Sequence, residues 1–241
     1  MSFERPSSPV PGEPGPPLVP EAQPADVTAP AMRLQILSTE HWSLLATRSL
    51  VWNEVFGRAG MYLSTLSGAI VALALVAQGT RFGETFKLFA LVILPVVLFL
   101  GWTTFVRLGA SNYHDAQCVI GMNRIRGAYL QLAPELRRYF VMSPHDDARG
   151  VGITMAFPPG HRPFVHMLAA TPTVVSVINS VIVGALVAIV AIHFAIGDAL
   201  AVGLAVIGFA LAFAAHALWG RAAISRAQAR VQPIFPSPRE G

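Results

Sequence analysis

Three consecutive residues, His145, Asp146 and Asp147, combine imidazole and carboxylate groups. Further groups of the same kinds lie outside this run, at His114, Asp115 and His161. Imidazole and carboxylate side chains together can bind a divalent metal ion that activates water. A metal site at the three consecutive residues is therefore one hypothesis.

The spacing of these residues favours a structural interpretation. Adjacent side chains on a helix point in different directions, and the chain has no His-Glu-x-x-His ligand pair. Ser143 and Pro144 are typical of a helix cap and a first helical residue, and the two aspartates would then interact favourably with the helix dipole. The chain also lacks a glycine-rich phosphate loop and a serine nucleophile elbow. We predict a non-enzymatic protein without a cofactor.

The elements around these residues belong to a membrane protein. Of the 241 residues, 54% are hydrophobic and 12% are charged, whereas a soluble domain carries about 25% charged residues. The net charge is +4, but the arginines cluster at the ends of apolar runs, so we expect no nucleic-acid partner. Cys118 is the single cysteine, which excludes a disulfide scaffold.

Four stretches without Asp, Glu, Lys or Arg have lengths of 22, 19, 35 and 22 residues. A helix needs about 20 apolar residues to cross a bilayer. We place membrane spans at residues 59–79, 87–107, 173–195 and 199–220. The fold class is therefore all-α, a polytopic membrane protein with four transmembrane helices in two hairpins, 59–107 and 171–220.

The distribution of lysine and arginine predicts the orientation. The segments before, between and after the hairpins hold 15 of these residues, and the two hairpin turns hold 2. Cytoplasmic segments carry the excess of basic residues. We expect an inner-membrane protein whose N-terminus, C-terminus and central segment are cytoplasmic.

The segments outside the membrane differ in character. Residues 1–30 hold 9 of the 19 prolines and should form a disordered cytoplasmic tail. Residues 31–58 show an amphipathic helical pattern, which suits either the membrane surface or packing against the central segment. The central segment, residues 108–170, should begin as a helix that continues the second span and stops near Ala133, before Pro134. Residues 221–241 form a second cytoplasmic tail.

Small residues recur at every fourth position of two spans. Such stripes let helix backbones approach closely in lipid. The predicted helix-packing faces are Gly60, Ser64, Gly68 and Ala72 in the first span, and Ser176, Ser180, Gly184 and Ala188 in the third. The spacing leaves open whether each face meets another helix of the chain or a second subunit.

Polar residues are few inside the spans. They include Asn179 and His193 in the third span and His216 in the fourth. We interpret Asn179 and His216 as interhelical hydrogen-bonding groups rather than as a transport site.

Several segments resemble a known family: His41 to Leu50, Trp52 to Glu54, Ala90 to Gly101, Gly121 to Arg124, and His145 to Asp147. They are similar to an uncharacterised family of four-span integral membrane proteins from GC-rich bacteria. The resemblance covers about residues 34 to 200 and implies architecture only, because the family has no assigned activity.

The sequence thus predicts a scaffold or assembly component of the inner membrane. Its partners would be the lipid bilayer and either another protein or a second copy of the chain. Contacts with anionic lipid or a partner would come from Asn123, Arg124, Arg126, Arg137 and Arg138. The alternative is a homo-oligomeric channel or pore-forming effector that is gated through its cytoplasmic helices.

Overall fold

The computed structural model describes residues 30–156, 170–229 and 231–238, and these residues form helices without any strand. The elements are α1 (Pro30–Thr80), α2 (Glu84–Leu132), the 3-10 helix η1 (Pro134–Tyr139), α3 (Ala148–Thr154), α5 (Thr171–His193) and α6 (Asp198–Gln228). Residues 1–29 of the predicted tail and residues 157–169 of the predicted central segment lie outside the described residues.

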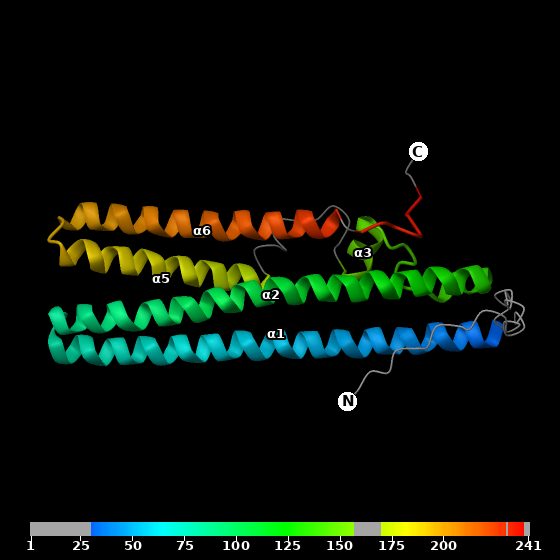
Figure 1. The fold of residues 1–241 in the computed structure, drawn as a ribbon, viewed down its shortest axis with the longest axis horizontal. Helices are drawn as coiled ribbons and strands as arrows, with labels where there is room; N and C mark the ends of the chain where they lie inside the picture. The colour runs from blue at the N-terminus through cyan, green and yellow to red at the C-terminus, as the bar shows by residue number, and fades with distance from the viewer. Residues whose placement is uncertain (1–29, 157–169, 230, 239–241) are drawn as a thin grey trace, which may run out of the picture.

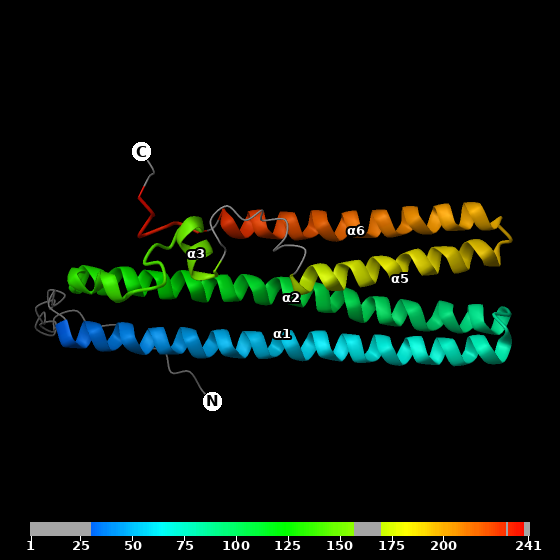
Figure 2. The ribbon, with the colours of Figure 1, turned by 180° about the vertical axis from the view of Figure 1, so that it is seen from behind.

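The four long helices lie side by side in the order α1, α2, α5, α6, as Figures 1 and 2 show. We call the end that carries Pro30 and Gln228 the termini side, and the opposite end the hairpin side. Helices α1 and α2 have 51 and 49 residues, so at 1.5 Å per residue each is about 75 Å long. They extend well beyond α5 and α6 on the termini side (Figure 1).

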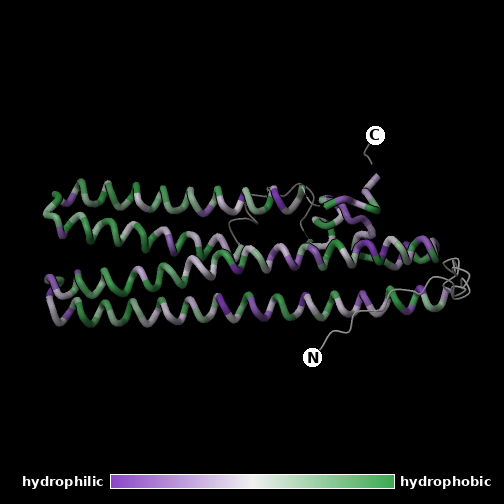
Figure 3. The backbone as a smooth tube through the Cα atoms, in the orientation of Figure 1, coloured by the Kyte–Doolittle hydropathy of each residue, from purple (hydrophilic) through white to green (hydrophobic). Residues whose placement is uncertain are grey.

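Each of the four long helices contains a stretch that is long and apolar enough to cross a membrane. Figure 3 shows hydrophobic residues dominating the hairpin-side part of the helices and hydrophilic residues gathering on the termini side. Large apolar side chains such as Ile70, Val92 and Leu211 are exposed on the isolated chain. A bilayer would cover them. Within the described residues, the prediction of an all-helical protein with four helices that are long and apolar enough to cross a membrane is confirmed.

Two tight turns close the hairpins. The backbone N–H of Phe82 donates to the carbonyl of Ala77 at 3.2 Å, and that of Ile196 donates to the carbonyl of Ala191 at 3.0 Å. Phe82 has a φ of 60° and Ala195 a φ of 53°, which is the left-handed conformation that ends many helices. These turns lie where the sequence predicts the two loops.

Residues 31–58 do not form a separate helix, because α1 continues through Arg58 without a break. This part of α1 packs along the termini-side extension of α2. Arg48 Nε lies 2.6 Å from Asp115 Oδ1, and Arg107 Nε lies 2.7 Å from Glu54 Oε1. Of the two arrangements considered for residues 31–58, the structure therefore has the packing against the central segment.

The central segment begins as the sequence predicts. Helix α2 continues past its apolar stretch and ends at Leu132, with the backbone N–H of Ala133 bonded to the carbonyl of Tyr129 at 2.9 Å. Pro134 then begins η1. The expected helix start at Ser143 is wrong: α3 begins at Ala148 and its N-cap is Asp147.

Candidate functional site

The structure has three features that could carry a function. They are a buried polar network between the long helices, a cavity beside this network, and a cluster of aspartates on the termini side. The first lies inside the apolar stretches, and the other two lie at or beyond their termini-side ends.

Asn179 is the centre of the buried network. Its side chain is fully buried, and its Oδ1 atom accepts a hydrogen bond from the Tyr62 hydroxyl at 2.8 Å. Its Nδ2 atom lies 3.4 Å from Nε2 of His216. The prediction that Asn179 and His216 form interhelical hydrogen bonds is consistent with these contacts, which join α1, α5 and α6.

The network determines which nitrogen of the His216 ring carries the proton and how the ring is oriented. Nδ1 lies 2.7 Å from the carbonyl oxygen of Ala212, which can only accept, so Nδ1 carries the proton. Nε2 is then the acceptor for the Asn179 amide. Trp102 and Phe105 of α2 contact the ring edge to face, with centroids at 5.1 and 4.7 Å. His216 is therefore held in one orientation at the boundary between α2 and α6.

Gly101 makes room for this network in α2. A Cβ atom at this position would overlap Oδ1 of Asn179 and would lie 2.9 Å from a ring carbon of Tyr62. Only a residue without a side chain lets the Asn179 amide reach α2 so closely. All four long helices thus meet at Asn179.

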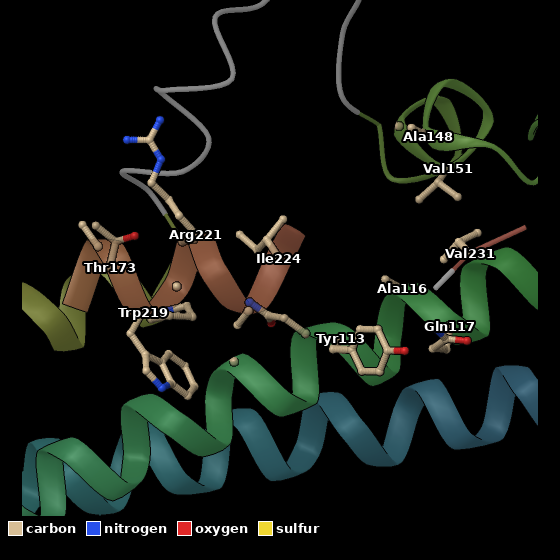
Figure 4. Close-up of a pocket in the computed structure, with 18 of the residues that line it drawn as sticks. Tyr113, Ala116, Gln117, Ala148, Val151, Thr173, Trp219, Arg221, Ile224 and Val231 are labelled. Carbon is tan, nitrogen blue, oxygen red and sulfur yellow. The ribbon is translucent and has the colours of Figure 1, made fainter. Parts of the chain in front are cut away.

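A cavity of about 990 Å³ opens beside His216, between α2 and α6. Its membrane-side wall includes Phe105, Phe213 and Trp219, and its far end is closed by Val151 of α3 and by Val231 and Pro233. Figure 4 shows Trp219 between α6 and α2, and Val151 facing Val231. The volume lies at the upper end of the range of small-molecule sites, which is about 300–1,000 Å³.

Asp146 and Asp147, which were considered as metal ligands, bind the backbone of the C-terminal segment instead. Oδ1 of Asp146 accepts from the backbone N–H of Phe235 at 2.7 Å, and Oδ2 accepts from that of Ile234 at 2.9 Å and from Arg124 Nε at 2.7 Å. Asp147 caps α3 by accepting from the backbone N–H of Gly150 at 2.8 Å. Asp147 also accepts two hydrogen bonds from Ser237.

These contacts explain the acidity of both aspartates. Burial acts to raise the pKa of Asp146, but the bonds from the backbone of Ile234 and Phe235 and from Arg124 outweigh it and lower the pKa below its ordinary value. The pKa of Asp147 is lowered in the same way, against burial, by its bonds from Gly150 and Ser237. Both side chains are therefore carboxylates that hold residues 231–238 against α2 and α3.

The described residues do not assemble the metal site that was considered as a hypothesis at His145, Asp146 and Asp147. Among residues 30–156, 170–229 and 231–238, no three His, Cys, Asp or Glu side chains come together as a metal-binding group. Asp115 pairs with Arg48 instead, and His114 is exposed. His161 lies outside the described residues. The Ser143 hydroxyl accepts from the backbone N–H of His145 at 3.1 Å, so it stabilises a turn rather than capping a helix.

The residues predicted to contact lipid or a partner fall into two groups. Asn123 is fully buried and bonds to the backbone of His145 and to Thr154, and Arg126 donates to it at 2.8 Å. Arg124 is bound to Asp146. These three residues make internal contacts, and their role in binding lipid or a partner stays a prediction. Arg137 and Arg138 of η1 are exposed.

The two small-residue faces also differ. In the first span Gly60, Ser64 and Gly68 are exposed, Ala72 is half-buried, and a Cβ atom on either glycine would meet nothing within 4 Å. In the third span Ser176, Ser180 and Gly184 are buried and Ala188 is half-buried. A Cβ on Gly184 would lie 3.0 Å from the carbonyl oxygen of Ala205, so this face packs closely on α6.

The sequence did not predict two contacts, that of Tyr62 with Asn179 and that of Phe235 with Gly127. Tyr62 stands in an apolar run, and its hydroxyl meets Asn179 only after 117 residues of chain. Phe235 packs its ring against Gly127, where a Cβ atom would lie 2.9 Å from it. The aromatic residue among the prolines of the C-terminal tail was the one available signal for this contact.

Comparison with known proteins adds no relative. The chain matches no protein-family model, no curated protein and no solved structure. The resemblance to a four-span bacterial family stays a prediction.

Proposed function

We propose that this chain is a non-enzymatic scaffold or assembly component of the bacterial inner membrane, with both termini in the cytoplasm. The observation that carries the proposal is the use of Asp146 and Asp147. Their carboxylates accept hydrogen bonds from backbone N–H groups and from Arg124. The best candidates for catalytic groups in the sequence therefore have a structural role. They fix residues 231–238 onto α2 and α3.

An exposed apolar surface on the termini side suits such a role. On and around η1, apolar side chains are exposed next to two arginines; these are Leu132, Leu136, Tyr139, Val141 and Met142. The Arg138 guanidinium lies over the Tyr139 ring, 4.9 Å from its centroid. Exposed apolar groups mixed with arginine and tyrosine are typical of protein interfaces. We call these five residues with Arg137 and Arg138 the η1 patch.

The test is the mass of the protein extracted in native nanodiscs together with its bound partners. The scaffold proposal expects a complex with another protein that the double variant Arg137→Glu, Arg138→Glu loses. The control variant Arg33→Glu changes an exposed arginine of α1 and should keep the complex. A wild-type monomer, or a complex that the η1 variant retains, would contradict this role, and a discrete homo-oligomer would favour the channel alternative.

The orientation has its own test. In a Cys118→Ser background, Tyr139→Cys labels the η1 patch and Gly79→Cys labels the hairpin side. Both sites are exposed, and a Cβ on Gly79 meets nothing within 4 Å. A membrane-impermeant maleimide added to intact spheroplasts should label Cys at 79 and spare Cys at 139. The reverse pattern would place the termini outside.

A further inference from the structure

The cavity between α2 and α6 lies across the end of the apolar stretches. Arg107 in α2 and Arg221 in α6 are the first charged residues after these stretches on the termini side. Phe105, Phe213 and Trp219 line the cavity before this level, whereas Asn112, Tyr113 and Gln117 line it after. Apolar side chains such as Val151 and Ile224 also line the part after this level, so the cavity wall is mostly apolar throughout, and the amide and phenol groups of α2 lie just beyond the end of the apolar stretches.

The α2 side of the cavity offers hydrogen-bond donors that no other described residue uses. Asn112, Tyr113 and Gln117 are exposed and make no hydrogen bond to any part of the chain that the structure describes. Each can donate to an oxygen atom of a ligand. Figure 4 shows Tyr113 and Gln117 on the α2 wall.

The charge at the edge of the cavity is positive. The guanidinium of Arg221 has no ion pair within the described ranges, and its side chain points away from α2 to the outer edge (Figure 4). Asp146 and Asp147 reach the far end of the cavity, but their carboxylates are bound to Arg124 and to backbone N–H groups. An anionic group at the edge would meet the Arg221 guanidinium, which forms no ion pair with the residues that the structure describes.

We propose that this cavity binds an anionic phospholipid of the termini-side leaflet. One acyl chain lies against Phe105, Phe213 and Trp219, and the headgroup contacts Asn112, Gln117 and Arg221. This order of apolar and polar groups matches the direction of a lipid in that leaflet. The inference goes beyond the scaffold role and does not depend on it.

Gly220 allows the cavity to be filled without disturbing the helices. It lines the cavity, and a Cβ atom on it meets nothing within 4 Å. Gly203 is a matched control, because it lies on the same helix, has the same open space and is outside the cavity. Detergent-solubilised full-length protein is titrated with phosphatidylglycerol and the bound lipid is counted by native mass spectrometry. We expect Gly220→Leu to weaken binding at least tenfold and Gly203→Leu to change it less than twofold.

Two further comparisons test the headgroup. Phosphatidylcholine with the same acyl chains should bind several-fold more weakly than phosphatidylglycerol. Arg221→Gln should remove this preference for the anionic lipid. Arg226→Gln removes the same charge outside the cavity and should keep the preference. Glycerol 3-phosphate alone should not compete with the lipid. Equal binding of the two lipids, competition by glycerol 3-phosphate, or equal effects of the two glycine variants would each overturn the proposal.

Discussion

The hydroxyl of Tyr62 donates a hydrogen bond of 2.8 Å to Oδ1 of Asn179, a residue that follows it by 117 positions. The amide of the same asparagine lies 3.4 Å from His216, and its oxygen lies against the backbone of Gly101. One polar side chain therefore contacts all four long helices. Lipid offers no competing hydrogen-bond partner, so these contacts should determine how the two hairpins fit together.

Replacing Tyr62 tests the strength of this contact. Interhelical hydrogen bonds in membranes contribute about 0.6 kcal/mol on average and about 1.7 kcal/mol at most. We expect Tyr62→Phe to lower the free energy of unfolding in bicelles by an amount in this range. Asn179→Ala should lower it more, because two contacts are lost. A double-mutant cycle of the two should give a positive coupling energy.

Tyr113→Phe is the control for Tyr62→Phe, because it also removes a tyrosine hydroxyl. Its hydroxyl makes no hydrogen bond within the described part of the chain, so its loss should leave the free energy of unfolding unchanged. A coupling energy near zero between positions 62 and 179 would show that their hydrogen bond does not stabilise the bundle.

Gly101→Ala tests the close approach of α2. The added methyl group would overlap Oδ1 of Asn179, and overpacking costs about 1–3 kcal/mol. The loss should be smaller in the Asn179→Ala background, because the overlapping atoms are then absent. Gly68→Ala places a methyl group in open space and should be neutral or stabilising, since alanine favours a helix over glycine by about 1 kcal/mol. An equal loss for the two glycine variants would exclude the close approach as the cause.

The four long apolar helices could be predicted from the sequence because their signal is local. Stretches of about 20 apolar residues and the turns between them are visible in composition alone. The same holds for the end of α2 before Pro134 and for Asn179 and His216 as interhelical polar groups. Each of these predictions needs only the residue type and its neighbours in the chain.

The side chains and helices that contact these residues could not be predicted, because such contacts join segments that are distant in the sequence. The stripes at Gly60 and Gly184 have the same spacing, yet among the described residues only the second meets another helix closely. Lipid tails are as apolar as leucine, so composition does not tell a lipid-facing face from a packed one. From the sequence, Asp146 similarly fitted either a metal ligand or a carboxylate near a helix dipole, and its actual partners, Ile234 and Phe235, lie 88 and 89 residues further along the chain.

The pair of Arg48 and Asp115 should stabilise the contact between α1 and the α2 extension. Asp115 is only 4% exposed, and removal of its partner would leave a buried charge uncompensated. Such losses cost about 3–5 kcal/mol when the pair is fully buried, and Arg48 is 26% exposed, so we expect somewhat less for Arg48→Ala. Hydrogen exchange of residues 31–58 should rise in this variant.

Arg58→Ala is the matched control. Its partner Glu54 is 33% exposed and keeps a second arginine, Arg107. The bonds from Arg107 and Arg58 lower the pKa of Glu54 to about 2, so Glu54 stays charged in both proteins at neutral pH. Exposed pairs contribute about 0–1 kcal/mol, so hydrogen exchange should change little. Equal effects of the two variants would mean that burial of Asp115 does not matter.

The attachment of residues 231–238 should weaken in acid. The pKa of Asp146 lies below its ordinary value of 3.8 in the folded protein, so its carboxylate stabilises the fold fully above that value. The stabilisation is lost as the pH falls through the lower, folded pKa. Asp146→Asn removes the charge and faces the N–H groups of Ile234 and Phe235 with one acceptor oxygen instead of two. We expect it to cost about 2–4 kcal/mol at pH 7.

Thermal unfolding of the wild type and of Asp146→Asn in nanodiscs, compared from pH 7 to pH 3, checks this expectation. The difference in melting temperature should be constant down to about pH 5 and should shrink below about pH 4, because the Asp146 carboxyl of the unfolded wild type then begins to bind a proton. Glu40→Gln, at an exposed position of α1, should match the wild type throughout. A difference that stays constant down to pH 3 would mean that the shape of the side chain, rather than its charge, holds Ile234 and Phe235.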